Sequence, residues 1–461
     1  MDTATRQALI DIVGKENVTE KVIDLVSYTY DASSYDHRPD CAMWAVSTEQ
    51  VSRILSLANE KRIPVTVRGA GTGLGGLAVP ARGGIVLDLT RMNKVLELSI
   101  PDRLAVVQPG VVYADFQALL ARSGFFFPPD PASGVVCTLG GNVATNAGGL
   151  HAVKYGSTRD YVLRLEAVLA SGEVMRVGAR TMKTSSGYDL CRLLVGSEGT
   201  LAVVTEITLK IAPKAAHTAT ALATFHALED AGEAVTRVMH SEVTPSVMEL
   251  LDGAVISLLR EHAHIDLPDV EALLLMETDG MTEAYVRLQL EKVAEMFRAC
   301  NAAEVEMAAS EEDAERLWKA RKSIGGMVGA LHLDYIPEDI TVPMSQIAVF
   351  LRRSEELSRT HGLDLFNFGH AGDGNLHTNI LFDRNDPDQV ARLESLLYDL
   401  HKLACDLGGT LSGEHGIGMT KAKYMPLEHD PTALKVMRTL KRAFDPNNIL
   451  NPGKMHLDQE T

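Results

Sequence analysis

Two histidines in the second half of the chain flank a turn, in the sequence GHAGDGNLH. His370 and His377 stand on either side of Asp373 and Gly374. On one continuous strand, two imidazoles seven residues apart would face opposite sides of a sheet. A turn at Asp-Gly instead makes a hairpin, and its facing strand ends can bring the two rings together. We therefore expect His370 and His377 to converge.

Two further clusters of polar residues could also bind a ligand. Glu414 and His415 stand between glycines in LSGEHGIGMTK, where a ligand can approach closely, and Arg321 follows Trp318 in LWKARKS. Two imidazoles and one carboxylate are a metal-ligand set that leaves coordination positions open. The residue types alone also fit solvent-facing histidines, a polar turn and a surface arginine. The pattern by itself leaves these alternatives open.

A glycine-rich loop in the first half, RGAGTGLGG at 68–76, has the G-x-G-x-x-G spacing of a dinucleotide fingerprint. A Rossmann loop would open a helix, with an acid about twenty residues further on. Here apolar segments that are typical of strands lie on both sides, at 62–69 and 84–90, and Pro80 breaks any helix between them. The sequence predicts a glycine loop between two strands, whose N–H groups can bind an anion without a helix.

The remaining patterns predict an α+β chain of several domains. They indicate a capped helix after Ser47, a hairpin turn at 171–173, a long strand at 203–211, helices and strands alternating after Ala215, and a final helix stopped by Pro446. We predict an FAD-binding domain at 1–213, a substrate domain at 214–425 and a helical segment at 426–461. The FAD assignment rests on the resemblance described below.

Composition excludes some classes of function. The net charge of −17 argues against a protein that mainly binds nucleic acid or anionic lipid. The five dispersed cysteines suit a reducing compartment and have no iron–sulfur or zinc spacing. We expect a cytoplasmic protein, at most peripheral to a membrane, because no secretory signal and no membrane-spanning window are evident.

Seven motifs in chain order carry a resemblance to a known family. They are VRGAGTGLGG, TLGGNVATNAGG, YG, GSEGTLAVVTEITLKI, GHAGDGNLH, GEHGIG and FDPNNILNPGK. Together they resemble the vanillyl-alcohol-oxidase-type (PCMH) FAD-linked oxidases, in the D-2-hydroxyacid dehydrogenase branch. That branch includes cytochrome-type D-lactate dehydrogenases, D-2-hydroxyglutarate dehydrogenases and glycolate oxidase FAD subunits. The resemblance implies a PCMH-type FAD-binding domain of two α+β subdomains, a ferredoxin-like substrate domain with helices, and a C-terminal segment that returns to the FAD domain.

The resemblance also implies which residues contact FAD. The expected contacts are Arg68, Gly69, Ala70, Gly71, Thr72, Gly73 and Leu74 around the pyrophosphate; Pro129, Asp130, Thr138, Gly141, Asn142, Thr145, Asn146, Gly148 and Gly149 around flavin and phosphates; Glu198, Gly199 and Ile207 near adenine and ribose; and Asn451. Many relatives tether FAD through a histidine where this chain has Thr72. We therefore expect non-covalent FAD, with Cys137 a buried thiol.

For the reaction, the resemblance implies a divalent metal, usually zinc, on His370, His377 and Glu414. His415 would take the hydroxyl proton, while hydride passes from C2 to flavin N5. Substrate contacts would come from Arg321, His370, Asn375 and His377, with the Arg321 guanidinium clamping the carboxylate.

One departure bears on the substrate. Enzymes selecting 2-hydroxyglutarate carry a lysine near the strand that here reads DYIPEDITVP, which has none. This favours a short, D-lactate-like acid, with D-2-hydroxyglutarate and glycolate as alternatives. Electrons would pass to a separate acceptor (a quinone, a cytochrome or an electron-transfer flavoprotein), and oxygen is the alternative. A non-redox FAD transferase of the alkylglycerone-phosphate synthase type and a non-catalytic subunit of a larger complex are the rival interpretations. A homodimer through the second domain is a further expectation from the family.

Overall fold

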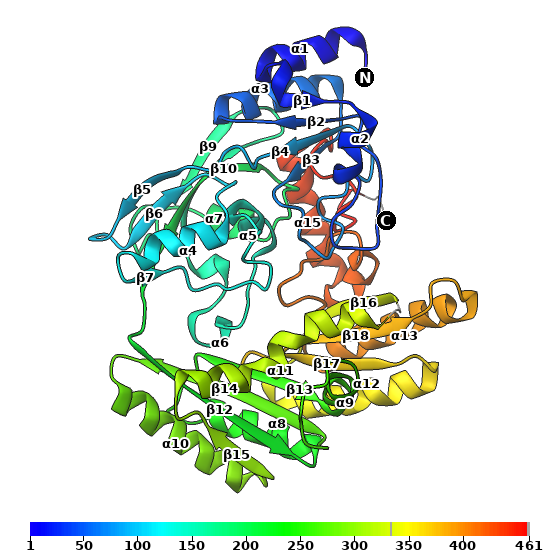
Figure 1. Ribbon diagram of the computed structural model, residues 1–461. Coiled ribbons are helices and arrows are strands. Elements are labelled where there is room, and N and C mark those ends of the chain that lie inside the picture. Colours follow the sequence, from blue (N-terminus) through cyan, green and yellow to red (C-terminus); the bar gives the residue numbers. More distant parts are fainter. Residues whose placement is uncertain (332–333, 459–461) are drawn as a thin grey trace. The chain divides into compact units, whose positions relative to one another are not determined.

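The computed structural model describes residues 1–331 and 334–458 (Figure 1). The chain forms two compact units. Unit 1 comprises Met1–Gly148, Gly156–Lys214 and Glu414–Thr461, and unit 2 comprises Gly149–Tyr155 and Ala215–Gly413. Both units contain helices and strands, which confirms the predicted α+β class.

One part of unit 1 is a four-stranded sheet in the order β1-β2-β4-β3. Its strands are β1 (Val18–Thr19), β2 (Cys41–Trp44), β4 (Ile85–Asp88) and β3 (Val65–Arg68). The last three run parallel. Helices α1 (Thr3–Val13) and α3 (Thr48–Lys61) bury apolar faces against this sheet. The first glycine loop follows β3 and leads to β4, as the sequence predicts.

The other part of unit 1 is a five-stranded antiparallel sheet in the order β5-β6-β10-β8-β9. Its strands are β5 (Val95–Ser99), β6 (Leu104–Val107), β10 (Val203–Lys210), β8 (Val162–Val168) and β9 (Val174–Gly178). The predicted turn at 171–173 joins β8 to β9. The second glycine-rich run is more than a loop, because helix α5 (Leu139–Thr145) forms within it and buries Leu139 and Val143.

Several shorter elements complete unit 1. They are α2 (Val22–Leu25), α4 (Tyr113–Ala121), α7 (Leu190–Leu194), α14 (Met425–Glu428) and α15 (Pro431–Phe444), the strand pair β7 (Phe125–Phe126) and β11 (Ala212–Pro213), and 3-10 helices at Lys15–Asn17, Val26–Tyr28, Thr158–Asp160 and Ala422–Tyr424. Helix α15 is fixed by the buried Lys441, which donates to the carbonyls of Thr200 and Leu450 and to Asp445.

Unit 2 is built on a seven-stranded antiparallel sheet in the order β15-β12-β14-β13-β17-β18-β16. Its strands are β15 (Glu304–Met307), β12 (His217–Phe225), β14 (Ala272–Gly280), β13 (Val247–Asp252), β17 (Leu365–His370), β18 (Asn375–Phe382) and β16 (Asp334–Thr341). Its helices are α6 (Ala152–Tyr155), α8 (Leu228–Met239), α9 (Gly253–His262), α10 (Glu283–Ala299), α11 (Glu311–Ala330), α12 (Ile347–His361) and α13 (Pro387–Asp406), with a 3-10 turn at Met344–Gln346.

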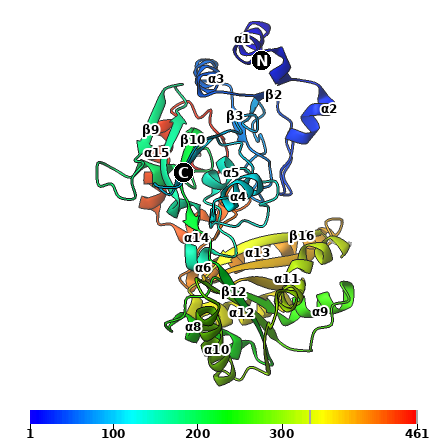
Figure 2. The same cartoon turned by 60° about the vertical axis from the view of Figure 1, so that its left-hand side comes forward.

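Helices cover both faces of the unit 2 sheet. On one face, α9 and α11 bury apolar side chains against Leu251, Leu273 and Phe366 of the strands. On the other, Phe225 of β12 makes an edge contact with Phe297 of α10, at 6.1 Å between ring centroids. Figure 2 shows α8, α10 and α12 grouped together and α9 beside α11. Because strand residues alternate between faces, every second residue of each strand faces α9 and α11.

A short piece of the second glycine-rich run belongs to unit 2. Lys154 forms an ion pair with Asp279 of β14, and the Tyr155 hydroxyl donates to the same carboxylate at 2.5 Å. The His151 ring lies 3.2 Å from the Ser246 carbonyl oxygen. These contacts attach Gly149–Tyr155 to the sheet of unit 2.

Among the described residues, none of the helices is both long enough and apolar enough to span a lipid bilayer.

Candidate active site

A row of polar side chains crosses four adjacent strands of unit 2. Glu249 on β13 pairs with His370 on β17, His370 with Asn375 on β18, and Asn375 with Thr341 on β16. The strand alternation that turns Leu251 and Phe366 toward α9 and α11 turns Glu249 and His370 the same way. The apolar face of the sheet thus becomes polar toward this end.

His370 and His377 meet across the β17–β18 hairpin. Their ring centroids lie 5.1 Å apart in a T-shaped arrangement, and both side chains are buried. The turn between them depends on Gly374, whose φ is +85°, and a Cβ there would overlap the Val342 carbonyl oxygen. The local turn therefore brings the two imidazoles together.

Glu249 joins His370 to Arg321. One carboxylate oxygen lies 2.5 Å from His370 Nδ1 and the other 2.5 Å from Arg321 Nε, and the side chain is fully buried. Burial alone would raise the pKa of Glu249, but the nearby His370 and Arg321 outweigh it and hold the pKa at about 2. Glu249 is therefore a buried carboxylate, which is stable only because both oxygens are paired.

Arg321 comes from α11, and its guanidinium lies over the Phe368 ring of β17. Its guanidinium carbon is 4.8 Å from the centre of the Phe368 ring, and the side chain is 18% exposed. Apart from the Nε bond to Glu249, its guanidinium makes no hydrogen bond or ion pair with any residue that the structure describes. The two terminal nitrogens can thus serve an anion.

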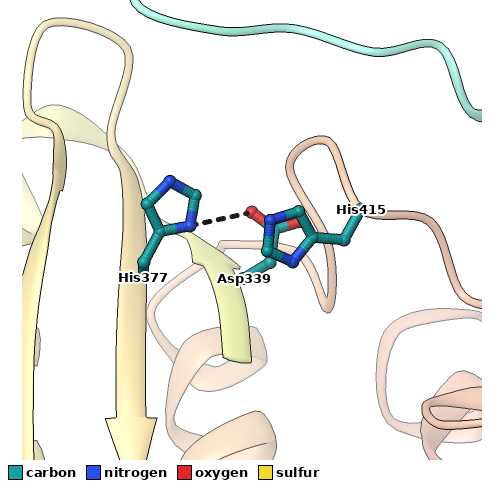
Figure 3. A group of neighbouring side chains, drawn as sticks. All are labelled: Asp339, His377 and His415. Carbon is teal, nitrogen blue, oxygen red and sulfur yellow. Dashed lines mark ion pairs between the residues drawn. The ribbon is translucent and has the colours of Figure 1, made fainter. Parts of the chain in front are cut away.

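Asp339 is another buried acid on this face. It is the register partner of His377, with 3.9 Å between its Oδ1 and the ring Nδ1 (Figure 3). It also accepts from Asn375 Nδ2 at 2.6 Å and from Ser412 Oγ at 2.7 Å, and its backbone carbonyl accepts from the Gly413 amide. Asp339 therefore fixes the chain immediately before Glu414.

Unit 1 contains a cavity of about 250 Å³ on the first glycine loop. Of the residues expected at FAD, those that line it are Arg68, Gly69, Ala70, Gly71, Thr72, Gly73, Leu74, Thr138, Gly141, Asn142, Thr145, Glu198, Gly199 and Asn451. Glu414 and His415 line the same cavity. His415, also labelled in Figure 3, is thus a residue of unit 1, two positions beyond the end of unit 2.

The Arg68 side chain packs against the first glycine loop. It is buried, donates to the Tyr30 carbonyl at 2.8 Å and lies 5.5 Å from the Tyr28 ring centre. Gly71 has a φ of +72°, and a Cβ there would overlap this guanidinium. The loop backbone therefore borders the cavity while the Arg68 charge serves the fold.

Asn142 fits a cofactor in this cavity. The residue is 4% exposed and lines the cavity, and its Nδ2 has no oxygen or nitrogen acceptor in the part of the chain that the structure describes. Its side chain interacts instead with the Cys137 thiol, a weak acceptor. A buried donor without an acceptor costs free energy, so a ligand that supplies an acceptor would be stabilised.

Glu198 and Asn451 hold the backbone around the cavity. The Glu198 carboxylate accepts from the amides of Ile417 and Gly418, and burial raises its pKa to about 7. Asn451 accepts from the Val67 amide at 2.8 Å and donates to the Glu198 carbonyl at 2.6 Å. These two side chains connect the glycine loop to the segment that carries Glu414 and His415.

Comparison with known proteins identifies this architecture. The family model of the FAD linked oxidases' C-terminal domain matches residues 214–455, and that of an FAD binding domain matches residues 39–178. The chain belongs to the FAD-linked oxidase family.

Relatives of this FAD-linked oxidase carry two different names. A glycolate oxidase subunit from Bacillus subtilis is 39% identical over 98% of this chain and 96% of its own length. A D-lactate dehydrogenase from Archaeoglobus fulgidus is 40% identical over 89% of each chain. The chain is therefore an FAD-linked oxidoreductase, and the names of its relatives indicate different substrates.

Solved structures agree on the fold of this FAD-linked oxidase. A p-cresol methylhydroxylase is similar with a TM-score of 0.82, covering 99% of this chain and 98% of that one, at 18% identity. An alkyldihydroxyacetonephosphate synthase gives a TM-score of 0.76, with 98% and 86% covered, at 20% identity. At these identities the likeness concerns the fold alone.

Some residues expected at FAD lie elsewhere in the structure. Those that do not line the described cavity are Pro129, Asp130, Asn146, Gly148, Gly149 and Ile207. Asp130 accepts from the Tyr113 hydroxyl at 3.1 Å, Asn146 accepts from the Ser157 hydroxyl at 3.0 Å, and Gly149 belongs to unit 2. The side chains of Asp130 and Asn146 thus form hydrogen bonds with other residues of unit 1.

Sequence reasoning missed other residues. Apolar side chains complete the cavity wall, among them Leu77, Leu89, Leu194 and Val203. Nothing distinguishes them from ordinary core residues in the sequence. Glu249 and Asp339 were also missed. Asp339 is one of three acids in the strand DYIPEDIT, whereas Glu249 is an acid among apolar residues in VMELLD. A charge in such a strand is a usable signal, since buried acids are rare without a partner.

Proposed function

We propose that this FAD-linked oxidoreductase oxidises a short D-2-hydroxy acid, D-lactate or a close analogue, to the 2-oxo acid. The observation that carries the proposal is that Arg321 and His370 are both hydrogen-bonded to the carboxylate of Glu249. A guanidinium with available terminal nitrogens and an imidazole are held on one carboxylate. That combination suits a molecule with a carboxylate beside a hydroxyl group.

The reaction removes a proton from the hydroxyl group and a hydride from C2. Bound FAD supplies the two-electron acceptor for that hydride. The cavity of unit 1, with the glycine loop along its wall and the buried Asn142 donor, which has no oxygen or nitrogen acceptor in the described chain, supports binding of this cofactor. Thr72 at the position of a tethering histidine supports a non-covalent cofactor.

In this proposal Arg321 binds the substrate carboxylate. Its two terminal nitrogens form a planar fork that matches a carboxylate, and the Phe368 ring beneath keeps the fork in one plane. The Asn375 amide is fixed by Asp339 and lies on the same row as His370. It would contact the acid from the side of β18.

A divalent cation, zinc first, would be held by His370, His377 and Glu414. Neutral imidazoles and a carboxylate are suitable donors for it, and the two imidazoles already converge. Such a cation lowers the pKa of an alcohol bound to it. Glu414 follows Gly413, whose amide is hydrogen-bonded to Asp339. His415, next in the chain, would take the hydroxyl proton.

Strand β16 supports a short acid. Its sequence DYIPEDIT contains acids and no lysine or arginine, so this strand offers no cation to a second substrate carboxylate. The relatives named D-lactate dehydrogenase and glycolate oxidase agree with a small 2-hydroxy acid. As a dehydrogenase, the protein would pass its electrons to a separate quinone, cytochrome or electron-transfer flavoprotein.

An anaerobic visible spectrum tests the proposal. The purified FAD-loaded protein is mixed separately with D-lactate, glycolate, D-2-hydroxyglutarate and L-lactate. We expect D-lactate to bleach the flavin absorption and L-lactate to leave it unchanged. If no acid bleaches the flavin in the zinc-loaded protein, the proposal is wrong, and a non-redox use of FAD becomes the better hypothesis.

A further inference from the structure

The carboxylate of Glu249 has two partners with different tasks in the proposed reaction. We propose that Glu249 is a positioning residue that orients a metal ligand, His370, and the substrate clamp, Arg321, at the same time. The inference rests on the proposed function and adds a residue that no motif in the sequence indicated. It predicts that one substitution weakens both metal binding and substrate binding.

The contact with His370 sets the ring's protonation. When Nδ1 carries the proton and donates it to Glu249, the lone pair of the imidazole is on Nε2. Carboxylate partners of metal-binding histidines fix the tautomer and the orientation of the ring, and they typically raise metal affinity. The pairing of Glu249 with His370 across β13 and β17 fixes this contact through the backbone. Glu249 would therefore prepare His370 for a cation.

The contact with Arg321 sets the direction of the guanidinium. The Glu249 carboxylate accepts a hydrogen bond from Arg321 Nε, and the Phe368 ring packs against the guanidinium. With both fixed, the two terminal nitrogens point together away from Glu249. A substrate carboxylate would then meet a fork that is already oriented, which reduces the entropy lost on binding.

Glu249 itself is remote from any ligand. The residue is 0% exposed, and its two oxygens are used by His370 and Arg321. It therefore acts through its partners and is not a catalytic residue. An amide in its place has only one oxygen acceptor, and its NH₂ group would face a donor. Glu249→Gln must therefore either lose one of the two contacts or donate its NH₂ to His370 Nδ1, which would put the ring proton on Nε2, the atom needed for a cation.

The chain offers a matched control. Asp279 is also a buried acid on this sheet face, where its carboxylate is paired with Lys154 and Tyr155 and makes no hydrogen bond to His370 or Arg321 among the described residues. Asp279→Asn thus removes a buried charge pair of similar kind without touching the two residues in question. Both variants should lose stability, and only Glu249→Gln should lose ligand binding.

The experiment uses the FAD-loaded full chain. Zn²⁺ affinity is measured by calorimetric titration of the metal-free protein, KM for D-lactate by steady-state kinetics, and FAD content by visible absorption. For Glu249→Gln we expect Zn²⁺ affinity to fall about 10- to 100-fold and KM to rise about tenfold or more, with FAD content unchanged. Asp279→Asn should match the parent in both ligand measurements.

Several outcomes would overturn the inference. Zn²⁺ affinity and KM equal to those of the parent would do so, as would equal losses in Asp279→Asn. If Glu249→Gln does not fold, Glu249→Asp replaces it: the shorter acid keeps the charge but cannot reach both partners, and unchanged affinity and KM would again refute the idea. If the parent binds no Zn²⁺ and no acid bleaches its flavin, the proposed function fails first, and this inference fails with it.

Discussion

The backbone of Gly413 lies against the side-chain amide of Asn375. A Cβ built on Gly413 would be 2.5 Å from Asn375 Nδ2 and closer still to Thr341 Oγ1, so no side chain fits at this position. Both contacts lie within unit 2, one residue before Glu414.

Gly413→Ala should therefore destabilise unit 2 and displace the chain that leads to Glu414. We expect a loss of about 1–3 kcal/mol in the free energy of unfolding, typical of overpacking, together with weaker Zn²⁺ binding. Thermal unfolding and calorimetric titration measure the two effects. Gly325→Ala is the control, because a Cβ at that exposed helical position meets nothing within 4 Å. It should be neutral or stabilising, and a Gly413→Ala protein as stable as the parent would contradict the steric argument.

His370→Ala should abolish Zn²⁺ binding and turnover but leave the protein yellow with FAD. The cofactor cavity lies in unit 1 and does not include His370. Metal analysis and the visible spectrum of the purified variant report the two properties. His361→Ala, which removes a partly exposed ring bound to Asp399, is the control and should retain both. Full turnover of His370→Ala after chelation would refute the metal assignment.

Arg321→Lys should raise KM for D-lactate by roughly tenfold or more while Zn²⁺ and FAD stay bound. Lysine keeps the positive charge but cannot form the bidentate pair or lie flat on the Phe368 ring. Steady-state kinetics over a range of D-lactate concentrations separates KM from kcat. Arg316→Lys, on the exposed side of the same helix, should behave as the parent. An unchanged KM in Arg321→Lys would remove Arg321 from the substrate site.

Asn142→Ala should weaken FAD binding by about tenfold. The buried Nδ2 donor finds no oxygen or nitrogen acceptor within the described chain, so its hydrogen bond with the cofactor would contribute about 1–1.5 kcal/mol. Fluorescence titration of the FAD-free protein gives the affinity. The exposed Asn447 offers the comparison, since Asn447→Ala removes an amide far from the cavity lining. Equal FAD affinity in parent and Asn142→Ala would mean that this donor does not face the cofactor.

Glu198 should make stability depend on pH. Burial raises its pKa from the ordinary 4.5 to about 7, so between these values the folded protein holds a proton that the unfolded chain releases. The free energy of unfolding therefore falls as pH rises from 4.5 to 7, by on the order of 3 kcal/mol from this group. Glu198→Gln should remove that part of the slope, whereas Glu173→Gln on an exposed turn should keep it. Chemical denaturation at several pH values measures it, and parallel slopes for parent and Glu198→Gln would contradict the prediction.

Local patterns allowed much of this molecule to be predicted. The strand–loop–strand around the first glycines follows from nearby residues alone, and so does the hairpin that joins His370 to His377. Helix α5 was not predicted, because three of its positions, 140–142, are glycine or asparagine. It forms because Leu139 and Val143 find a core, which only the tertiary fold supplies.

The partners of the site residues could not be predicted in the same way. Glu249 is 121 positions from His370 and 72 from Arg321. Their meeting depends on the order of strands in the seven-stranded sheet and on the helix packed against it. No local spacing encodes this order, although an acid within a buried strand signals that some cation must lie opposite.

The attachment of Gly149–Tyr155 to unit 2 has a consequence for dissection of the protein. A fragment consisting of 215–413 would lack Lys154 and Tyr155, and the buried carboxylate of Asp279 would lose both its ion-pair partner and its phenol donor. Such a truncated piece would start with an uncompensated charge in its interior. A recombinant substrate unit would therefore need this heptapeptide supplied, for example by fusing Gly149–Tyr155 through a flexible linker.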